Sequence, residues 1–183
     1  MYKAHMNSAP PPLSFEQAVA GLLNGDFSRL EPLFISAADE TSCPIIDWHK
    51  QHLFANHSEA LAEAFTCACF NGALPVVQYF LANNLDPSGG ARTGLNAFHW
   101  AANRGQKNVV ELLIRAGAPL ETRNHYGGTV LGCAVWSAVH ETKPDHLAII
   151  KLLLTAGANP LACDYPSGRA DVDELIAAAR TKN

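Results

Sequence analysis

The most constraining feature of this sequence is a segment that recurs with a period of about 33 residues, a length typical of stacked repeats. The interval from Gly72 to Gly105 equals the one from Phe65 to Phe98, and Leu131 continues the latter series. Each copy contains an apolar run around the aromatic or leucine position and a second run rich in Val, Ile and Leu. A unit of this kind cannot bury both of its faces alone, so it has to stack on neighbouring copies. The sequence therefore predicts a solenoid.

The third copy contains an insertion. Val109 and Ile149 hold the same place in their copies, but the interval between them exceeds the repeat period by seven. Both flanks stay in register, so the extra residues lie between Trp136 and Ile149, at about Ala138 to Pro144. We expect them to lengthen a helix by up to about two turns and to form a ridge beside the concave face. Since insertions in repeats often lie on the binding side, this ridge is predicted to select the partner.

Each copy is expected to consist of two helices. In the second copy, Phe98, Ala101 and Ala102 have the i, i+3, i+4 spacing of a buried helix face. Glycine and asparagine accept the left-handed conformation that ends a helix. The residues predicted to end helices in this way are Gly105, Gly117, Gly157 and Asn84.

These motifs resemble the ankyrin repeat family. The family pattern T-P-L-H-x-A stands here as Asn96–Ala101 and Thr129–Ala134, and its closing pattern matches Leu112–Ala118 and Leu152–Ala158. The resemblance covers roughly residues 58–180, and the chain looks most like small stand-alone bacterial ankyrin proteins. It implies an all-α ankyrin repeat solenoid of about three full helix-turn-helix repeats with N-terminal and C-terminal capping helices. It also implies a module that binds another protein.

The organisation expected from these patterns has three parts. Residues 1–12 form a flexible N-terminal arm, residues 13–57 an N-terminal helical cap, and residues 58–183 the repeats with a C-terminal half repeat. In the cap, Ser14 is expected to cap the first helix, and a polar loop is expected at Ser36 to Ser42. Other predicted helices span Phe27 to Phe34, Ile45 to Phe54, Glu59 to Phe70 with Ser58 as its cap, and Asp171 to Arg180.

Composition excludes several classes of protein. The formal charge is 13 minus 17, or −4, which argues against a nucleic-acid-binding face. No apolar run is long enough to span a membrane, and the first residues lack a secretory signal. Five cysteines without such a signal are expected to be reduced thiols. We therefore expect a cytoplasmic protein that binds neither nucleic acid nor membrane. The sequence also lacks G-x-S-x-G, G-x-G-x-x-G, Walker A and H-E-x-x-H motifs, and together with the family resemblance this predicts a protein, expected to be a monomer, that is no enzyme and holds no cofactor.

Two cysteine and histidine patterns invite a metal interpretation. Cys67 and Cys69 form a C-x-C pair, but residues two apart on a helix point to different faces, so we interpret them as buried hydrophobes. His49 and His52 could place two imidazoles on one helix face, yet further zinc ligands with a suitable spacing are missing, and a solvated or capping role is favoured.

The insertion and the repeat motif hold three further histidines. His140 and His146 flank Asp145, which is expected to cap the helix that follows. A metal site that uses His140 and His146 with Cys133 stays open as an alternative. The family resemblance implies that His99 ties adjacent turn loops by hydrogen bonds, a structural role.

The repeat register places a set of side chains on the surfaces that ankyrin proteins use for partners, the concave face and the turn tips. Trp, Tyr and Arg among them are the types enriched at binding hot spots. The candidate concave residues are Phe70, Asn71, Asn103, Arg104, Trp136 and Ser137. The candidate turn-tip residues are Arg92, Thr93, Leu95, Arg123, His125 and Tyr126. Packing under the insertion is an equal alternative for Trp136.

Three interpretations of function follow. The first is a module that binds a partner protein through its concave face and turn tips. The second is a bacterial immunity or antitoxin-type inhibitor of a toxic enzyme, and the third is a metal-binding protein that uses His140 and His146. A purely structural module once fused to other domains is a further alternative.

Overall fold

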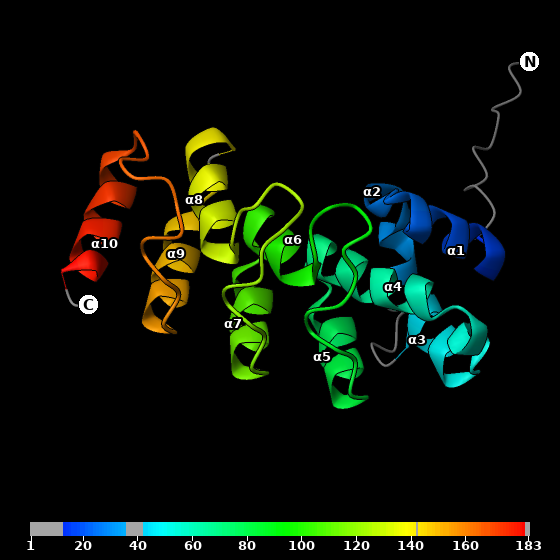
Figure 1. The fold of residues 1–183 in the computed structure, drawn as a ribbon. Coiled ribbons are helices and arrows are strands. Elements are labelled where there is room, and N and C mark those ends of the chain that lie inside the picture. Colours follow the sequence, from blue (N-terminus) through cyan, green and yellow to red (C-terminus); the bar gives the residue numbers. More distant parts are fainter. Residues whose placement is uncertain (1–12, 36–41, 142, 182–183) are drawn as a thin grey trace, which may run out of the picture.

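The computed structural model describes residues 13–35, 42–141 and 143–181. The predicted N-terminal arm and most of the predicted polar loop lie outside these ranges. All regular secondary structure of the described residues is helical. The helices follow one another along an elongated stack, with the N-terminal cap at one end and the last helix at the other (Figure 1). None of the described helices is long and apolar enough to cross a membrane.

The N-terminal cap is built from short helices. Ser14 caps the first of them in a reciprocal capping box with Gln17, as predicted. Gly25 then adopts a left-handed conformation with φ 76° and ends this helix. The elements are α1 (Phe15–Asn24), α2 (Phe27–Leu30), a 3-10 turn (Glu31–Phe34), α3 (Pro44–Lys50) and a second 3-10 turn (Leu53–Asn56).

Two predictions for this region were wrong. The helix expected over Ile45 to Phe54 ends at Lys50, because His52 adopts a left-handed backbone with φ 59°. The turn that follows buries Phe54 against the ring of Phe15, with 5.0 Å between centroids. Ser58 does not cap the next helix; it is that helix's first residue.

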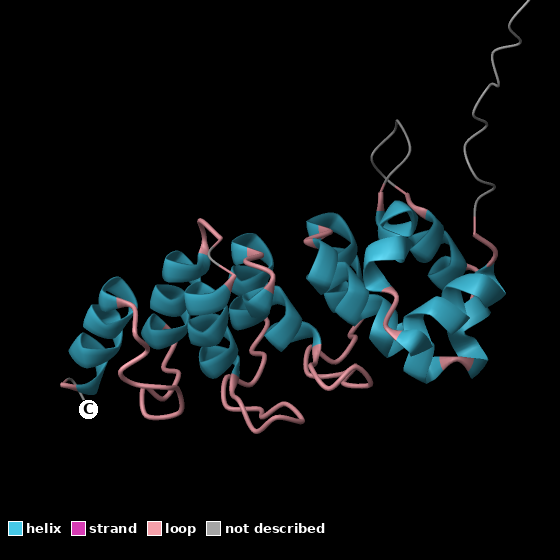
Figure 2. Cartoon of the chain, turned by 90° about the horizontal axis from the view of Figure 1, so that it is seen from above, coloured by secondary structure: helices cyan, strands magenta, loops and turns pink. Residues whose placement is uncertain are grey.

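The repeats form two rows of helices. The inner row consists of α4 (Ser58–Asn71), α6 (Ala97–Asn103) and α8 (Val130–His140), which pack side by side. The outer row consists of α5 (Leu74–Ala82), α7 (Lys107–Arg115) and α9 (His146–Thr155), and α10 (Ala170–Arg180) closes the stack on α9. Long turn loops project along one edge between successive units (Figure 2). The buried residues form one core that is continuous along the stack.

The predicted glycine and asparagine helix ends are confirmed. Gly105, Gly117, Gly157 and Asn84 all have positive φ. The insertion lengthens α8 within the expected limit of about two turns: α6 ends at Asn103, whose equivalent is residue 136, whereas α8 continues to His140. The extension is therefore about one turn.

Adjacent units are tied at the turn-loop edge by hydrogen bonds to loop carbonyl oxygens from side chains in the inner helices or, for Thr129, at the N-cap of one. The role expected for His99 is confirmed, since its Nε2 lies 3.2 Å from the Gly128 carbonyl oxygen. Threonine hydroxyls make the other two ties, so the row continues without further histidines. The three ties join Thr66 to Gly90, His99 to Gly128 and Thr129 to Ala162.

A second row of ties lies at the opposite end of the inner helices. Gln106 Nε2 donates to the Phe70 carbonyl oxygen at 3.1 Å, and His146 Nε2 lies 3.0 Å from the Asn103 carbonyl oxygen. Gln106 and His146 are separated by the same interval as Val109 and Ile149, which makes them equivalent positions of the second and third repeats. His146 Nδ1 accepts from the Lys143 backbone N–H, so its Nε2 carries the proton and donates.

The cysteines are free thiols, as predicted. Cys67 and Cys69 are fully buried in the core, and burial raises the pKa of both thiols. Both side chains therefore behave as small hydrophobes, which confirms the core interpretation of the C-x-C pair.

Candidate functional site

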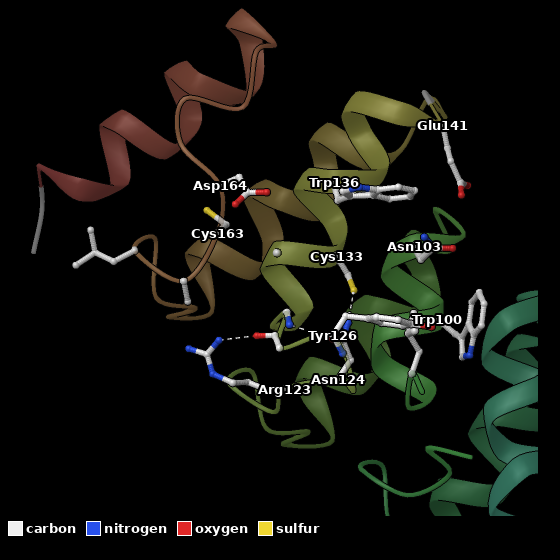
Figure 3. A pocket seen from close by; sticks show the side chains of 16 residues that line it. Trp100, Asn103, Arg123, Asn124, Tyr126, Cys133, Trp136, Glu141, Cys163 and Asp164 are labelled. Atoms are coloured by element: carbon white, nitrogen blue, oxygen red, sulfur yellow. Dashed lines mark hydrogen bonds between the residues drawn. The ribbon is translucent and has the colours of Figure 1, made fainter. Parts of the chain in front are cut away.

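A groove of about 820 Å³ lies on the inner side of the second and third repeats (Figure 3). Its walls come from α6 and α8 and from the turn loops at residues 123–128 and 161–164. We call this hollow the open groove. It is lined by Trp100, Asn103, Tyr126, Cys133, Trp136 and Glu141, among others.

Trp136 forms one wall of the open groove. Its side chain is 49% exposed, so the insertion does not bury it. One face of the indole stacks on the imidazole of His140, with centroids 4.5 Å apart and planes 18° apart. His140 lies one helical turn further along α8 and is held by a hydrogen bond from its Nδ1 to the Trp136 carbonyl oxygen. The stacking fixes the ring and leaves its other face toward the groove.

Tyr126 forms the opposite wall, from the tip of a turn loop, and it is 82% exposed. Internal hydrogen bonds fix this loop: Asn124 Oδ1 accepts from the backbone N–H groups of Tyr126 and Gly128, and Arg123 Nη1 donates to the Gly127 carbonyl oxygen. The tyrosine is therefore presented by an ordered loop.

The groove is deep at its base because two small residues, Gly132 and Cys133, line it there. Cys133 holds the position that Trp100 holds one repeat earlier, so a thiol lies where the neighbouring unit carries an indole. Asn124 Nδ2 donates to Cys133 Sγ at 3.2 Å, and burial raises the pKa of this thiol to about 11. Gly132 lacks a side chain, and a Cβ there would lie 3.4 Å from the Ala162 carbonyl oxygen. The thiol is protonated at neutral pH and serves as an inert floor.

Two carboxylates border the groove. Glu141 follows the last residue of α8, and Asp164 lies on the turn loop after α9. Both residues are exposed, and within the described part of the chain neither forms an ion pair. Arg123 is the one basic side chain among the lining residues, and its guanidinium is bound to the backbone of its own loop.

The inner face of the first repeat is filled instead. The rings of Phe70 and Trp100 lie 5.1 Å apart in an edge-to-face arrangement, and Phe27 from α2 packs against both. The Arg104 guanidinium lies 4.7 Å from the Phe70 ring centre. Trp100 Nε1 also donates to Thr93 Oγ1. We call this group the aromatic cluster.

The structure divides the candidate partner-binding residues into two groups. Leu95, Asn103, Arg123, Tyr126 and Trp136 line the open groove, and the structure brings them together. The remaining candidates have partners within the chain or lie elsewhere. Phe70 and Arg104 belong to the aromatic cluster. Asn71 donates to the Phe27 carbonyl oxygen, and Arg92 binds Glu59 and the Leu23 carbonyl oxygen. Ser137 is fully buried, and His125 lies exposed on the turn loop.

Several groove residues were not predicted from the sequence. Two of them could have been found from the repeat register. The interval from Val109 to Ile149, counted from Asn124, leads to Asp164, and counted from Glu121 it leads to Leu161. The alternation of Trp100 with Cys133 was visible in the repeat alignment, and it marks the floor. Glu141 carried no signal, because the repeat gives no register inside the insertion.

The structure does not support the metal interpretation of His140 and His146. His146 is fully buried, with both ring nitrogens bonded to backbone groups, while His140 stacks on Trp136. Among residues 13–35, 42–141 and 143–181, no group of three His, Cys, Asp or Glu side chains is placed to hold a metal ion. Asp145 precedes α9, but its side chain makes no capping hydrogen bond.

Comparison with known proteins agrees with the architecture. A family model described as ankyrin repeats in three copies matches residues 51–164. An ankyrin repeat domain from Acinetobacter baumannii AYE superposes with a TM-score of 0.58 at 25% identity, over 89% of this chain and 97% of that one.

Two curated proteins share part of the sequence. The probable E3 ubiquitin-protein ligase XBOS33 of Oryza sativa subsp. japonica is 35% identical over 77 residues, which are 42% of this chain and 14% of that protein. The ANK repeat-containing protein nipk-1 of Caenorhabditis elegans is 29% identical over 117 residues, which are 60% of this chain and 19% of that protein. The chain thus spans less than a fifth of either relative. On the match to the family model and the repeat architecture, the chain belongs to the ankyrin repeat family.

Proposed function

We propose that this protein binds a partner protein through the open groove and the adjoining turn tips. Ankyrin repeats are in general protein–protein interaction modules and typically non-enzymatic scaffolds. The observation that carries the proposal is the pair of exposed aromatic side chains, Trp136 and Tyr126, on opposite walls of one groove. Exposed aromatic residues beside a hollow are typical of binding hot spots.

The way the two walls are held supports this role. Trp136 is stacked on His140, and the Tyr126 loop is closed by hydrogen bonds of Asn124. Side chains that are ordered before binding lose little conformational entropy when a partner arrives. The solenoid acts as a rigid frame that displays a preformed surface.

The insertion contributes one border of this surface through Glu141 and is proposed to influence which partner binds. It is also part of the packing, because Ala138 is fully buried and its carbonyl oxygen accepts from Arg169 Nη1 at 2.6 Å. Removing residues 138–144 would therefore disturb the fold, and substitution of Glu141 is the cleaner test.

The test is a crosslinked pull-down from source cells, read by mass spectrometry. The wild type is compared with the double variant Trp136→Ala, Tyr126→Ala after circular dichroism has shown equal helicity. We expect a protein that the wild type retains and the double variant loses, with purified components then giving at least a tenfold weaker affinity, about 1.4 kcal/mol.

The matched control is Leu53→Ala, which removes an exposed apolar side chain from the N-terminal cap. It should retain the partner as the wild type does. Equal retention by the double variant would move the binding surface away from the open groove and overturn the proposal.

A further inference from the structure

The charges and apolar surfaces of the open groove together define the chemistry of what it binds. We infer that the groove takes a short linear segment of the partner in which an arginine stands beside a large apolar side chain. This inference rests on the proposed function and specifies the occupant of the same site. A volume of about 820 Å³ lies in the range of pockets that hold a few chemical groups rather than a folded domain.

The apolar side chain has its place above the floor of the groove. Cys133 leaves a hollow there, and Trp100, Tyr126 and Trp136 line it (Figure 3). The hollow is framed by two indoles and a thiol that is protonated at neutral pH, so an aromatic, leucine or methionine side chain loses water there without leaving a polar group unpaired. A charged side chain at this point would be desolvated without a partner, because the thiol is neutral and already accepts from Asn124.

The cation has its place at the end of α8. Glu141 supplies an exposed carboxylate that forms no ion pair within the described residues. The C-terminal end of α8 carries the negative end of the helix dipole, and the groove face of Trp136 offers an indole ring to a cation. These three features favour a positive charge at this border, and the neighbouring Lys143 ammonium donates to the Arg104 carbonyl oxygen at 3.1 Å and forms no ion pair with Glu141.

Arginine fits this border better than lysine. Its guanidinium is planar, stacks on an aromatic face and can pair with a carboxylate through two parallel hydrogen bonds. The indole of Trp136 is already stacked on the opposite side by His140, so the ring is held in place for a second planar group. An ammonium group would gain the charge attraction but not the stacking.

The rest of the groove disfavours an acidic segment. Asp164 adds a second carboxylate, without an ion pair among the described residues, at the other border, and the one lining cation, Arg123, is bound to the Gly127 carbonyl oxygen. The chain as a whole carries a formal charge of −4. A segment rich in Asp or Glu would meet like charge at both borders.

The experiment selects a displayed library of random short peptides on the purified full chain. We expect the enriched peptides to share an arginine next to an aromatic, leucine or methionine residue. A synthetic peptide of the enriched sequence should bind at least tenfold more weakly to the variant Glu141→Gln than to the wild type, and its own Arg→Lys version should also bind more weakly. Its affinity should fall with rising salt.

The matched control variant is Glu174→Gln, which removes an exposed carboxylate from α10, away from the groove. It should bind the peptide as the wild type does. Enrichment of acidic or purely apolar peptides, or equal binding by Glu141→Gln, overturns the inference. So does a library without any enriched peptide.

The peptide experiment and the pull-down fail separately. If the pull-down finds a partner that depends on Trp136 and Tyr126 but the library yields no arginine-containing peptide, the proposed function stands and the inference about a linear segment is wrong. If neither the partner nor the peptide depends on Trp136, both fail together.

Discussion

The inner face of the solenoid differs between its two halves although both are built from the same repeat. In the first half, Phe70 and Trp100 meet under α2 and form the aromatic cluster with Phe27. In the second half, Asn103 and Trp136 hold the position of Phe70, and Cys133 holds the position of Trp100. The same surface is hollow there. One unit uses its large side chains for packing, whereas the next exposes one of them.

The difference lies in what covers each half. The N-terminal cap brings α2 onto α4, and Asn71 and Cys67 both approach the Phe27 carbonyl oxygen. The open groove is bordered instead by α6, α8 and the turn loops, with Glu141 of the insertion at one border. Burial, and not the repeat motif, decides whether a tryptophan at such a position stabilises the fold or remains free to bind. The predictions below test this contrast from the largest expected effect to the smallest.

The largest effect is expected in the aromatic cluster. Phe27→Ala removes a ring that is 2% exposed and leaves a cavity beside Phe70 and Trp100, so the free energy of unfolding should fall by about 3–4 kcal/mol. Urea denaturation followed by circular dichroism measures it. A loss below about 1 kcal/mol would mean that the cap does not stabilise the first half.

The second prediction converts the open half into a filled one. Cys133→Trp places an indole where the neighbouring repeat carries Trp100, so it should occupy the groove and weaken the binding of the captured partner at least tenfold. Titration calorimetry measures the affinity. Cys133→Ala is the matched control, since it enlarges the hollow and should retain binding. Undiminished affinity in the tryptophan variant would place the binding surface outside the groove.

The third prediction concerns the loss of folding stability at acidic pH. Burial lowers the pKa of His146, and the charges of Lys143 and Arg169 act in the same direction, while the Asn103 carbonyl and Glu141 oppose them. The unfolded chain takes up this proton near pH 6.5, but the folded chain takes it up only at lower pH. Stability from this site is therefore present above pH 6.5 and is lost as the pH falls through the lower folded value.

The variant His146→Gln isolates this effect. Gln106 makes the equivalent tie one repeat earlier, so glutamine should keep the bond to Asn103 at pH 7.5 and reduce the loss of stability between pH 7.5 and 5.5. Urea midpoints at both pH values measure it. The exposed His125→Gln is the control and should leave the slope unchanged. An equal slope in both variants would show that His146 does not cause the acid sensitivity.

The smallest effect is expected in the open half. Trp136→Ala removes a side chain that is 49% exposed and whose main partner is the exposed His140, so the free energy of unfolding should fall by less than about 1 kcal/mol. The same denaturation measurement applies. A loss as large as that of Phe27→Ala would erase the contrast between the two halves.

The fold could be predicted from the sequence wherever the repeat gives a register. The interval from Gly72 to Gly105 located the helix ends, and the motif residue His99 took its expected place between loops. The cap has no such register. His52 adopts a left-handed backbone just after the end of α3 and just before the buried Phe54, and no glycine or proline marks this turn in the sequence.

The site was predictable in part for the same reason. Register placed Trp136 and Tyr126 on the inner face and at the turn tip. It could not show that Arg92 is used to hold the cap through Glu59 and the Leu23 carbonyl oxygen, because these partners lie outside the aligned motif. Whether a side chain at a repeat position is free depends on contacts between distant parts of the chain.

The two rows of ties between units have a mechanical consequence. One row runs through His99 near the beginning of α6, and the other joins His146, the first residue of α9, to the Asn103 carbonyl oxygen at the end of α6, so the second and third units are fastened at both ends of α6. Bending the stack in either direction must stretch one of the rows. The two rows of ties therefore oppose changes in the curvature of this part of the stack.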